Sequence, residues 1–212
     1  MKRLRLWAML IGLIVVVFGG LYLWWDIDVR WRPHLIKSRQ ADIAKLLAGA
    51  GWVSPGLSGP KLYVIATRDC PACDAYEQSE FARLQRAGVD TRVIMIAPPD
   101  VNGAAKSTPA ERATVAELWV NRNWGLFQTW TSAPPDAWKA PHIAPADGDV
   151  ARTAVIAAGR DLVDSLKPLL NASGVKPGYP TLIWWAKDGT LNACLCAAPQ
   201  TYKYVRRDLG AD

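Results

Sequence analysis

K-L-Y-V-I-A-T-R-D-C-P-A-C, residues 61–73, is the stretch of this sequence that decides the fold. Its first part, Lys61 to Ala66, is short, apolar and rich in β-branched and aromatic residues, which predicts a buried strand. Pro71 to Ala87 is predicted to be a helix, because proline is favoured in a first turn and Gly88 follows the last one. The stretch therefore predicts a buried strand that leads directly into a helix.

The elements predicted further along extend this pair into an α/β domain. Thr91 to Ala97 is a second apolar strand, and a strand–helix–strand unit of about 35 residues fits a right-handed crossover between parallel strands. The later predicted elements are a mostly helical insert of about residues 104–172, strands at Thr181 to Ala186 and Thr190 to Leu195 around a Lys187–Gly189 turn, and a closing helix over residues 199–209. This order, β-α-β, insert, β-β-α, is the plan of a thioredoxin fold with an insertion.

The N-terminal segment has the length and composition of a membrane span. Leu6 to Trp25 contains no charged residue, and about twenty helical residues cross the hydrocarbon core of a bilayer. A cleaved signal peptide is the alternative, but the apolar run is longer than the usual signal core and no A-x-A site follows it. We therefore expect residues 1–25 to be an uncleaved anchor with the C-terminal body exported.

Two predicted segments separate the anchor from the domain. His34 to Ala50 has helical spacing of its apolar residues, and Ser54 to Pro60 is a turn-rich linker. We expect residues 26–60 to form a juxtamembrane helix and linker, and residues 61–212 to form the thioredoxin-like domain.

The positive charge of the chain does not indicate nucleic-acid binding. The formal net charge is +6, and three of these charges are Lys2, Arg3 and Arg5, which leaves +3 for the rest. No cluster of Lys and Arg interleaved with aromatic residues follows residue 40. We therefore expect no nucleic-acid partner.

Cys70 and Cys73 form a C-x-x-C pair at the junction between the predicted strand and helix. A helix N-terminus presents unpaired N–H groups and a partial positive charge, which together stabilise a thiolate. Cys70 would then be the exposed attacking thiol and Cys73, one turn on, the resolving thiol. Half of a zinc site is the alternative, because Cys194 and Cys196 complete a set of four thiols. An exported, oxidising location disfavours zinc, so redox chemistry is the favoured hypothesis and no metal is expected.

Five blocks of the sequence resemble the catalytic domain of the bacterial disulfide isomerases DsbC and DsbG. The blocks begin at Thr67, Gly88, Ala116, Gly174 and Lys187, and they read T-R-D-C-P-A-C-D-A-Y, G-V-D-T-R-V-I-M-I-A-P, A-E-L-W-V-N-R-N-W-G-L-F, G-V-K-P-G-Y-P-T-L-I-W and K-D-G-T-L. The resemblance covers about residues 61–209. It implies a periplasmic thioredoxin fold that exchanges thiols and disulfides with protein substrates.

The resemblance also assigns roles to individual residues. It makes Cys70 the nucleophile, Cys73 the resolving cysteine and Pro180 a cis-proline, with Tyr179 at the substrate-facing position before it. Tyr179 is bulkier than the Thr or Val associated with that position, and the separate N-terminal dimerisation domain of the family is replaced by the anchor and one short helix. The second departure weakens the isomerase prediction in particular.

Several other residues have both an inert and a functional interpretation. The inert interpretation of Cys194 and Cys196 is two small buried hydrophobic side chains or a structural disulfide. The functional interpretation is an accessory redox pair that exchanges electrons with Cys70 and Cys73. Arg68 and Asp69 flank the nucleophile, where Arg68 could stabilise the thiolate or both could face solvent. His34 and His142 have no nearby ligand partners in the sequence and are interpreted as solvated loop histidines.

The hypothesis is an enzyme: a disulfide reductase or isomerase of exported proteins that needs no cofactor beyond its redox-active disulfide. Its expected partners are exported cysteine-containing proteins, a membrane protein that donates or accepts electrons, and the lipid bilayer. Its expected place is the inner (cytoplasmic) membrane, single-pass, with the domain in the periplasm. The alternative is a non-catalytic, membrane-tethered chaperone or assembly subunit whose cysteines are structural.

Overall fold

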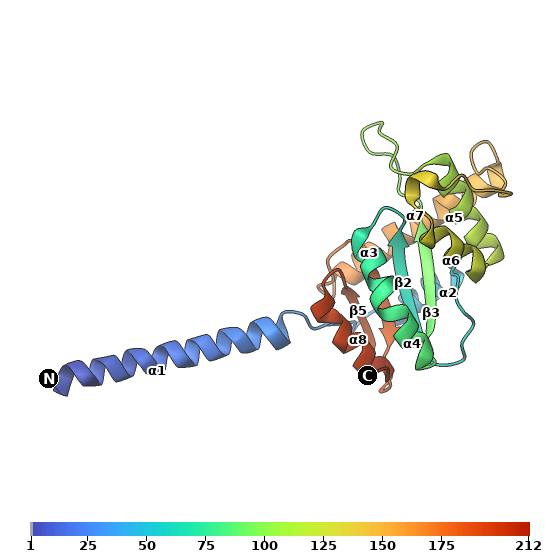
Figure 1. Ribbon diagram of the computed structural model, residues 1–212. Coiled ribbons are helices and arrows are strands. Elements are labelled where there is room, and N and C mark those ends of the chain that lie inside the picture. The colour runs from blue at the N-terminus through green and yellow to red at the C-terminus, as the bar shows by residue number, and fades with distance from the viewer. Residues whose placement is uncertain (1) are drawn as a thin grey trace. The chain divides into compact units, whose positions relative to one another are not determined.

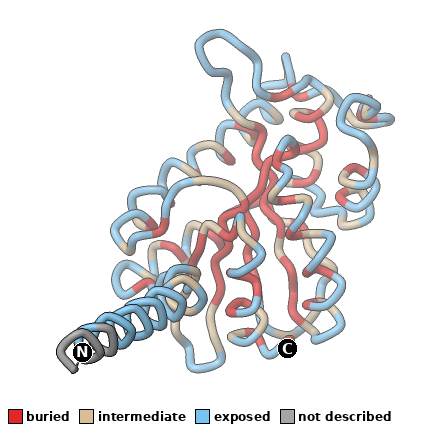
Figure 2. Tube along the Cα trace, turned by 60° about the vertical axis from the view of Figure 1, so that its left-hand side comes forward, coloured by how far each residue is buried: buried red, intermediate tan, exposed pale blue. Residues whose placement is uncertain are grey.

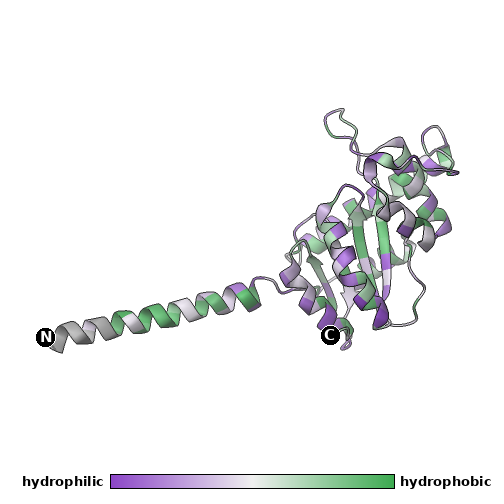
Figure 3. Ribbon diagram, in the orientation of Figure 1, coloured by the Kyte–Doolittle hydropathy of each residue, from purple (hydrophilic) through white to green (hydrophobic). Residues whose placement is uncertain are grey.

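The computed structural model describes residues 2–212, so the expected anchor at residues 1–25 lies within it except for Met1 (Figure 1). The chain forms two compact units, one ending at Arg32 and the other spanning Pro33–Asp212. In the first unit, helix α1 (Lys2–Trp24) continues into a π-helix, η1 (Trp25–Val29). One helical segment, Leu10–Val29, is long and apolar enough to cross a membrane, and Figure 3 shows the hydrophobic colouring along it. This segment overlaps the expected span from Leu10 to Trp25.

The second unit is built on a five-stranded sheet in the order β1-β5-β4-β2-β3. The strands are β1 (His34–Leu35), β2 (Lys61–Thr67), β3 (Asp90–Ile96), β4 (Thr181–Trp185) and β5 (Leu191–Leu195). β2 and β3 are parallel, and the other neighbours are antiparallel. The β2–β3 crossover followed by a β4–β5 hairpin on the far side of β2 is the thioredoxin arrangement. The predicted fold is confirmed.

Alternation along the strands divides the core between the two faces of the sheet. In β2, Leu62, Val64 and Ala66 join one buried cluster, whereas Tyr63 and Ile65 join the other, as the period of two in a strand requires. The first face is covered by α3 (Pro71–Tyr76), η2 (Glu77–Phe81), α4 (Ala82–Arg86) and α8 (Tyr202–Leu209), which follows the short 3-10 turn η4 (Pro199–Thr201). Helices α2 (Gln40–Gly49) and α7 (Val150–Asn171) cover the second. Figure 2 shows the buried strands between these more exposed helices.

The helical insert contains α5 (Pro109–Asn121), α6 (Trp124–Ser132), the short 3-10 turn η3 (Pro135–Ala137) and α7 (Val150–Asn171). Arg122 takes a left-handed conformation, so α5 ends there, and Asn123 caps a new helix by accepting the Leu126 N–H. Pro168 lies inside α7, which ends three residues later at Asn171.

The folded unit begins earlier than the predicted Lys61. β1 pairs with β5, and the Ile36 N–H donates to Leu191 O at 2.8 Å. Only after this strand does α2 begin, so the helix predicted from His34 starts at Gln40. Ile43 and Leu47 of α2 are fully buried in the second cluster. Residues 33–60 are therefore part of the domain, because the apolar face of α2 completes its core.

Candidate active site

Cys70 caps the helix that carries the C-x-x-C pair. It occupies the N-cap position of α3, with Pro71 in the first turn, and its Sγ accepts the backbone N–H of Cys73 at 3.1 Å. The two cysteines form a disulfide with their Cα atoms 5.2 Å apart. Backbone N–H groups at a helix start stabilise negative charge, so a Cys70 thiolate here has a donor already in place.

Cys70 is less exposed than the sequence predicted. Cys70 and Cys73 are equally buried, each 8% exposed. The reason is the closed disulfide, which holds Cys70 Sγ against the first turn of α3. Asp69 and Pro71 on either side of Cys70 are exposed, so the disulfide lies directly beneath the surface.

The loop before β4 provides the second part of the site. The Tyr179–Pro180 peptide bond is cis, as predicted. Because β4 runs antiparallel to β2, with Thr181 opposite Ile65, the start of β4 lies at the same end of the sheet as the C-terminal end of β2. The chain reaches Cys70 three residues beyond that end. The topology therefore brings Pro180 and Cys70 to the same end of the sheet.

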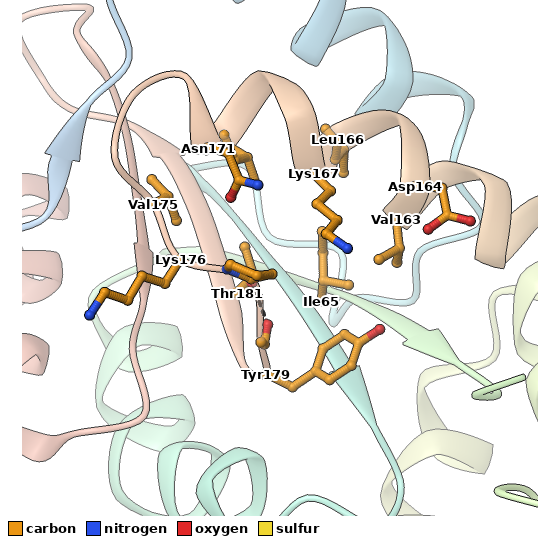
Figure 4. Close-up of a pocket in the computed structure, with 13 residues that line it drawn as sticks. Ile65, Val163, Asp164, Leu166, Lys167, Asn171, Val175, Lys176, Tyr179 and Thr181 are labelled. Atoms are coloured by element: carbon orange, nitrogen blue, oxygen red, sulfur yellow. Dashed lines mark hydrogen bonds between the residues drawn. The ribbon is translucent and has the colours of Figure 1, made fainter. Parts of the chain in front are cut away.

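Tyr179 also forms a wall of a cavity of about 310 Å³ under α7. Figure 4 shows its ring directed toward the α7 residues Val163 and Asp164, above the apolar floor around Ile65. Burial and the nearby Asp164 carboxylate raise the pKa of the Tyr179 phenol. The bulky side chain expected to face substrate thus packs between both halves of the core, against α7.

Arg68 holds the active-site loop to the insert. It is 7% exposed, so of the two interpretations the solvent-facing one does not hold for Arg68, whereas Asp69 is exposed. The guanidinium donates to the carbonyls of Thr131, at 3.3 Å, and Ala133, and it lies over the Trp130 ring. The C-terminal carbonyls of α6 attract this cation, which is why it points away from solvent.

Glu111 is a buried carboxyl that the sequence analysis did not single out. It is 8% exposed, Oε2 accepts the Thr108 N–H at 3.4 Å, and Oε1 has no hydrogen-bond partner. Burial raises its pKa to about 7, against the opposing effects of Thr108 and the Arg68 cation. Its signal in the sequence was T-P-A-E at the start of α5, a capping box in which this glutamate faces back to the cap.

The other two cysteines form a second disulfide. Cys194 and Cys196 are bonded with a Cα–Cα distance of 5.2 Å, and they are 4% and 0% exposed. A regular strand would separate these Cα atoms by about 6.6 Å, so the chain bends here, where β5 ends at Leu195. The four thiols of the zinc alternative are therefore divided between two disulfides. Across residues 2–212, no three His, Cys, Asp or Glu side chains gather as metal ligands would.

The two histidines lie in different parts of the fold, with His34 paired opposite Ala193 of β5. His34 is in β1 rather than in a loop, and His142 takes a left-handed conformation in the loop before α7. Both are exposed.

Comparison with known proteins finds solved structures that are similar at low sequence identity. No protein-family model matches the chain, and no curated protein matches its sequence. A linker-deletion mutant of ScsC from Proteus mirabilis is 12% identical, with a TM-score of 0.49 over 98% of this chain and 95% of that one. BcfH from Salmonella enterica Typhimurium is also 12% identical, with a TM-score of 0.46 over 96% and 90%.

A third similar structure is MdbA from Corynebacterium diphtheriae, which is a thiol-disulfide oxidoreductase. It is 15% identical, with a TM-score of 0.35 over 63% of this chain and 77% of that one. Similarities this distant say nothing of activity, and they do not distinguish a disulfide isomerase of the DsbC and DsbG kind. The function of this chain has to be argued from its own residues.

Proposed function

We propose that this protein is a thiol-disulfide oxidoreductase that reduces or isomerises disulfides in exported proteins through Cys70 and Cys73. One observation carries the proposal: a C-x-x-C disulfide caps α3, with Cys70 Sγ accepting the Cys73 N–H. A structural disulfide needs no helix N-terminus, whereas an attacking thiolate gains stability from one.

The reaction begins from the reduced pair. The Cys70 thiolate attacks one sulfur of a substrate disulfide, a Cys70–substrate bond forms, and the other substrate sulfur leaves as a thiolate. Cys73 then attacks Cys70 Sγ, which releases the substrate thiol and restores the Cys70–Cys73 disulfide. In isomerisation a different thiolate of the substrate attacks the substrate sulfur of the mixed disulfide instead, which forms a new substrate disulfide and releases the Cys70 thiolate, so no net electrons are consumed.

Tyr179 and Pro180 are the proposed substrate contacts. The loop that holds them lies at the end of the sheet that carries Cys70, and an extended peptide there can pair with backbone groups of the loop. The hydroxyl of Thr181 donates to Gly178 O at 2.6 Å, which fixes the loop on both sides of this pair.

The proposed location is the inner membrane, with residues 1–25 as a single-pass anchor and the domain in the periplasm. Leu10–Val29 supports the anchor, since a single apolar helix of this length spans a bilayer. The two disulfides, which pair all four cysteines, support an oxidising compartment. The proposed partners are exported cysteine-containing proteins and a membrane protein that exchanges electrons with Cys70–Cys73. We propose no cofactor beyond this disulfide.

Insulin reduction by dithiothreitol tests the proposal, and refolding of scrambled ribonuclease separates isomerase from reductase. We expect the wild-type chain to accelerate insulin reduction and the folded Cys70→Ser variant to leave it at the uncatalysed rate. A folded wild-type protein that does not accelerate it would refute the oxidoreductase function and favour a tethered chaperone or assembly subunit.

A further inference from the structure

The Cys194–Cys196 disulfide lies at the same end of the sheet as Cys70–Cys73. β2 and β5 are each antiparallel to β4, so the C-terminal ends of β2 and β5 lie at one end of the sheet. The register sets Val64, Leu182 and Cys194 in one row across the three strands, and all three belong to the cluster under α3. Cys196 lies two residues beyond Cys194, nearer that end of the sheet and in the same buried cluster.

Direct contacts join this second disulfide to the site. The Cys196 N–H donates to the carbonyl of Pro180 at 3.1 Å, so Cys196 is hydrogen-bonded to the cis-proline. Six residues later, Tyr202 meets Tyr76 of α3 edge to face, with ring centroids 4.8 Å apart. All four cysteines lie in the same buried cluster. The C-L-C segment is therefore hydrogen-bonded to the proline loop, and the chain that follows it packs against the helix that carries the first pair.

Stabilisation of the fold is a weak reason for a disulfide at this place. A disulfide constrains the unfolded chain more when the loop that it closes is longer. Cys194 and Cys196 are two residues apart in sequence, so their loop is almost the shortest possible. Cys194 also lies in β5, where pairing with Leu182 of β4 already fixes the backbone.

We propose that Cys194–Cys196 is a second redox pair that exchanges electrons with Cys70–Cys73 in the same chain. This proposal rests on the proposed function, because it requires Cys70 to be a reactive thiol. The second pair is buried, with Cys194 and Cys196 at 4% and 0% exposure, so a thiol from inside the domain reaches it more readily than one from solution. The chain would then store two electron pairs and need only one entry point at its surface.

The exchange balances without any further reactant. The Cys70 thiolate attacks Cys196 Sγ, the Cys194–Cys196 bond breaks, and Cys194 leaves as a thiolate that takes up a proton. The Cys73 thiolate then attacks Cys70 Sγ, which forms the Cys70–Cys73 disulfide and releases the Cys196 thiolate. Two electrons pass from the first pair to the second, and the reverse sequence returns them.

The first test compares how fast dithiothreitol reduces Cys194–Cys196 in two full-length proteins, followed by acid quenching, alkylation and peptide mass spectrometry. In the wild type the electrons enter through Cys70–Cys73. In the Cys70→Ser/Cys73→Ser variant this route is closed, so we expect reduction to slow by about tenfold or more. Equal or faster reduction in the variant would overturn the relay.

The second test traps the intermediate and does not depend on rates. In the full-length Cys73→Ser variant, Cys70 has no resolving partner, so we expect a peptide linked through Cys70 and Cys196. The Cys73→Ser/Cys194→Ser/Cys196→Ser variant is the control and must lack this peptide. A Cys70 that forms a mixed disulfide with glutathione but never with Cys196 would overturn the relay and leave the proposed function standing. A Cys70 unreactive toward both would overturn the proposed function and the relay with it.

Discussion

The backbone N–H of Cys73 donates a 3.1 Å hydrogen bond to the Sγ of Cys70. This contact makes the two cysteines unequal, although they are equally buried. Cys70 is the cap that receives the donor, whereas Cys73 belongs to the first turn and supplies it. The roles of attacking and resolving thiol follow from this asymmetry, because the stabilised thiolate is the one at the helix start.

Loss of the Cys70 sulfur is expected to abolish turnover. Cys70→Ser keeps a side chain that can accept the Cys73 N–H but removes the nucleophile, so insulin reduction should fall to the uncatalysed rate. Circular dichroism provides the folding control. If Cys70→Ala remained active while Cys73→Ala lost all activity, the two roles would be reversed.

Removal of residues 1–32 is expected to release a folded, active domain. Pro33–Asp212 is a compact unit with its own two-sided core, and the apolar segment ends before it. The full-length chain should resist alkaline extraction from membranes, and the shortened chain should be soluble and reduce insulin at the same rate. N-terminal sequencing of the membrane fraction is the independent check, since a mature chain that starts between Gly20 and Asp26 would mean a cleaved signal peptide.

Arg68→Lys is expected to destabilise the Pro33–Asp212 unit by about 1–3 kcal/mol. Lysine keeps the charge but loses the planar fork that reaches both Thr131 O and Ala133 O, and it leaves α6 carbonyls without their donor. Urea unfolding measures the loss. Arg86→Lys is the matched control, because Arg86 is exposed at the end of α4 and should change the stability little. Equal effects of the two substitutions would show that the Arg68 contacts contribute nothing.

Glu111 is expected to make the domain less stable as the pH rises from about 5 to about 8. Its pKa is about 7 in the folded chain against an ordinary value of 4.5. The folded state therefore holds the proton more tightly, and its advantage is complete below pH 4.5 and lost as the pH passes 7. After allowance for partial solvent screening, this loss is about 1–3 kcal/mol.

The neutral Glu111→Gln variant provides the comparison for this prediction. Glutamine keeps an oxygen that accepts the Thr108 N–H but does not titrate, so its stability should fall less over the same pH range. Urea unfolding of both proteins at the two pH values measures the difference. Parallel pH profiles would mean that the carboxyl ionises in the folded chain as it does in the unfolded one.

The fold was predictable because its signals are local. Apolar runs bounded by Gly and Pro located β2, β3, β4 and β5 to within about one residue at each end, and cysteine spacing at a strand–helix junction located the disulfide. The cis bond at Pro180 came from the resemblance to disulfide isomerases, since nothing in a dipeptide distinguishes cis from trans.

The parts that could not be predicted depend on tertiary contacts. β1 is two residues long and exists only because β5 offers an edge to pair with. The burial of Arg68 depends on carbonyls at the end of α6, more than sixty residues away. The Cys194–Cys196 bond depends on a bend at the end of β5, which no residue pattern in the sequence predicts. The pairing of β1 and the burial of Arg68 are fixed by partners distant in sequence.

The measurement that tests the central claim most directly is the identity of the cysteine that holds a substrate in mid-reaction. The Cys73→Ser/Cys194→Ser/Cys196→Ser protein and its Cys70→Ser/Cys194→Ser/Cys196→Ser counterpart are each incubated with an excess of a disulfide-containing substrate peptide, quenched with acid, alkylated and mapped by mass spectrometry without reduction. We predict the substrate peptide bonded to Cys70 in the first protein and little or none bonded to Cys73 in the second. A folded first protein with no adduct at Cys70, or an adduct at Cys73 alone, would contradict it.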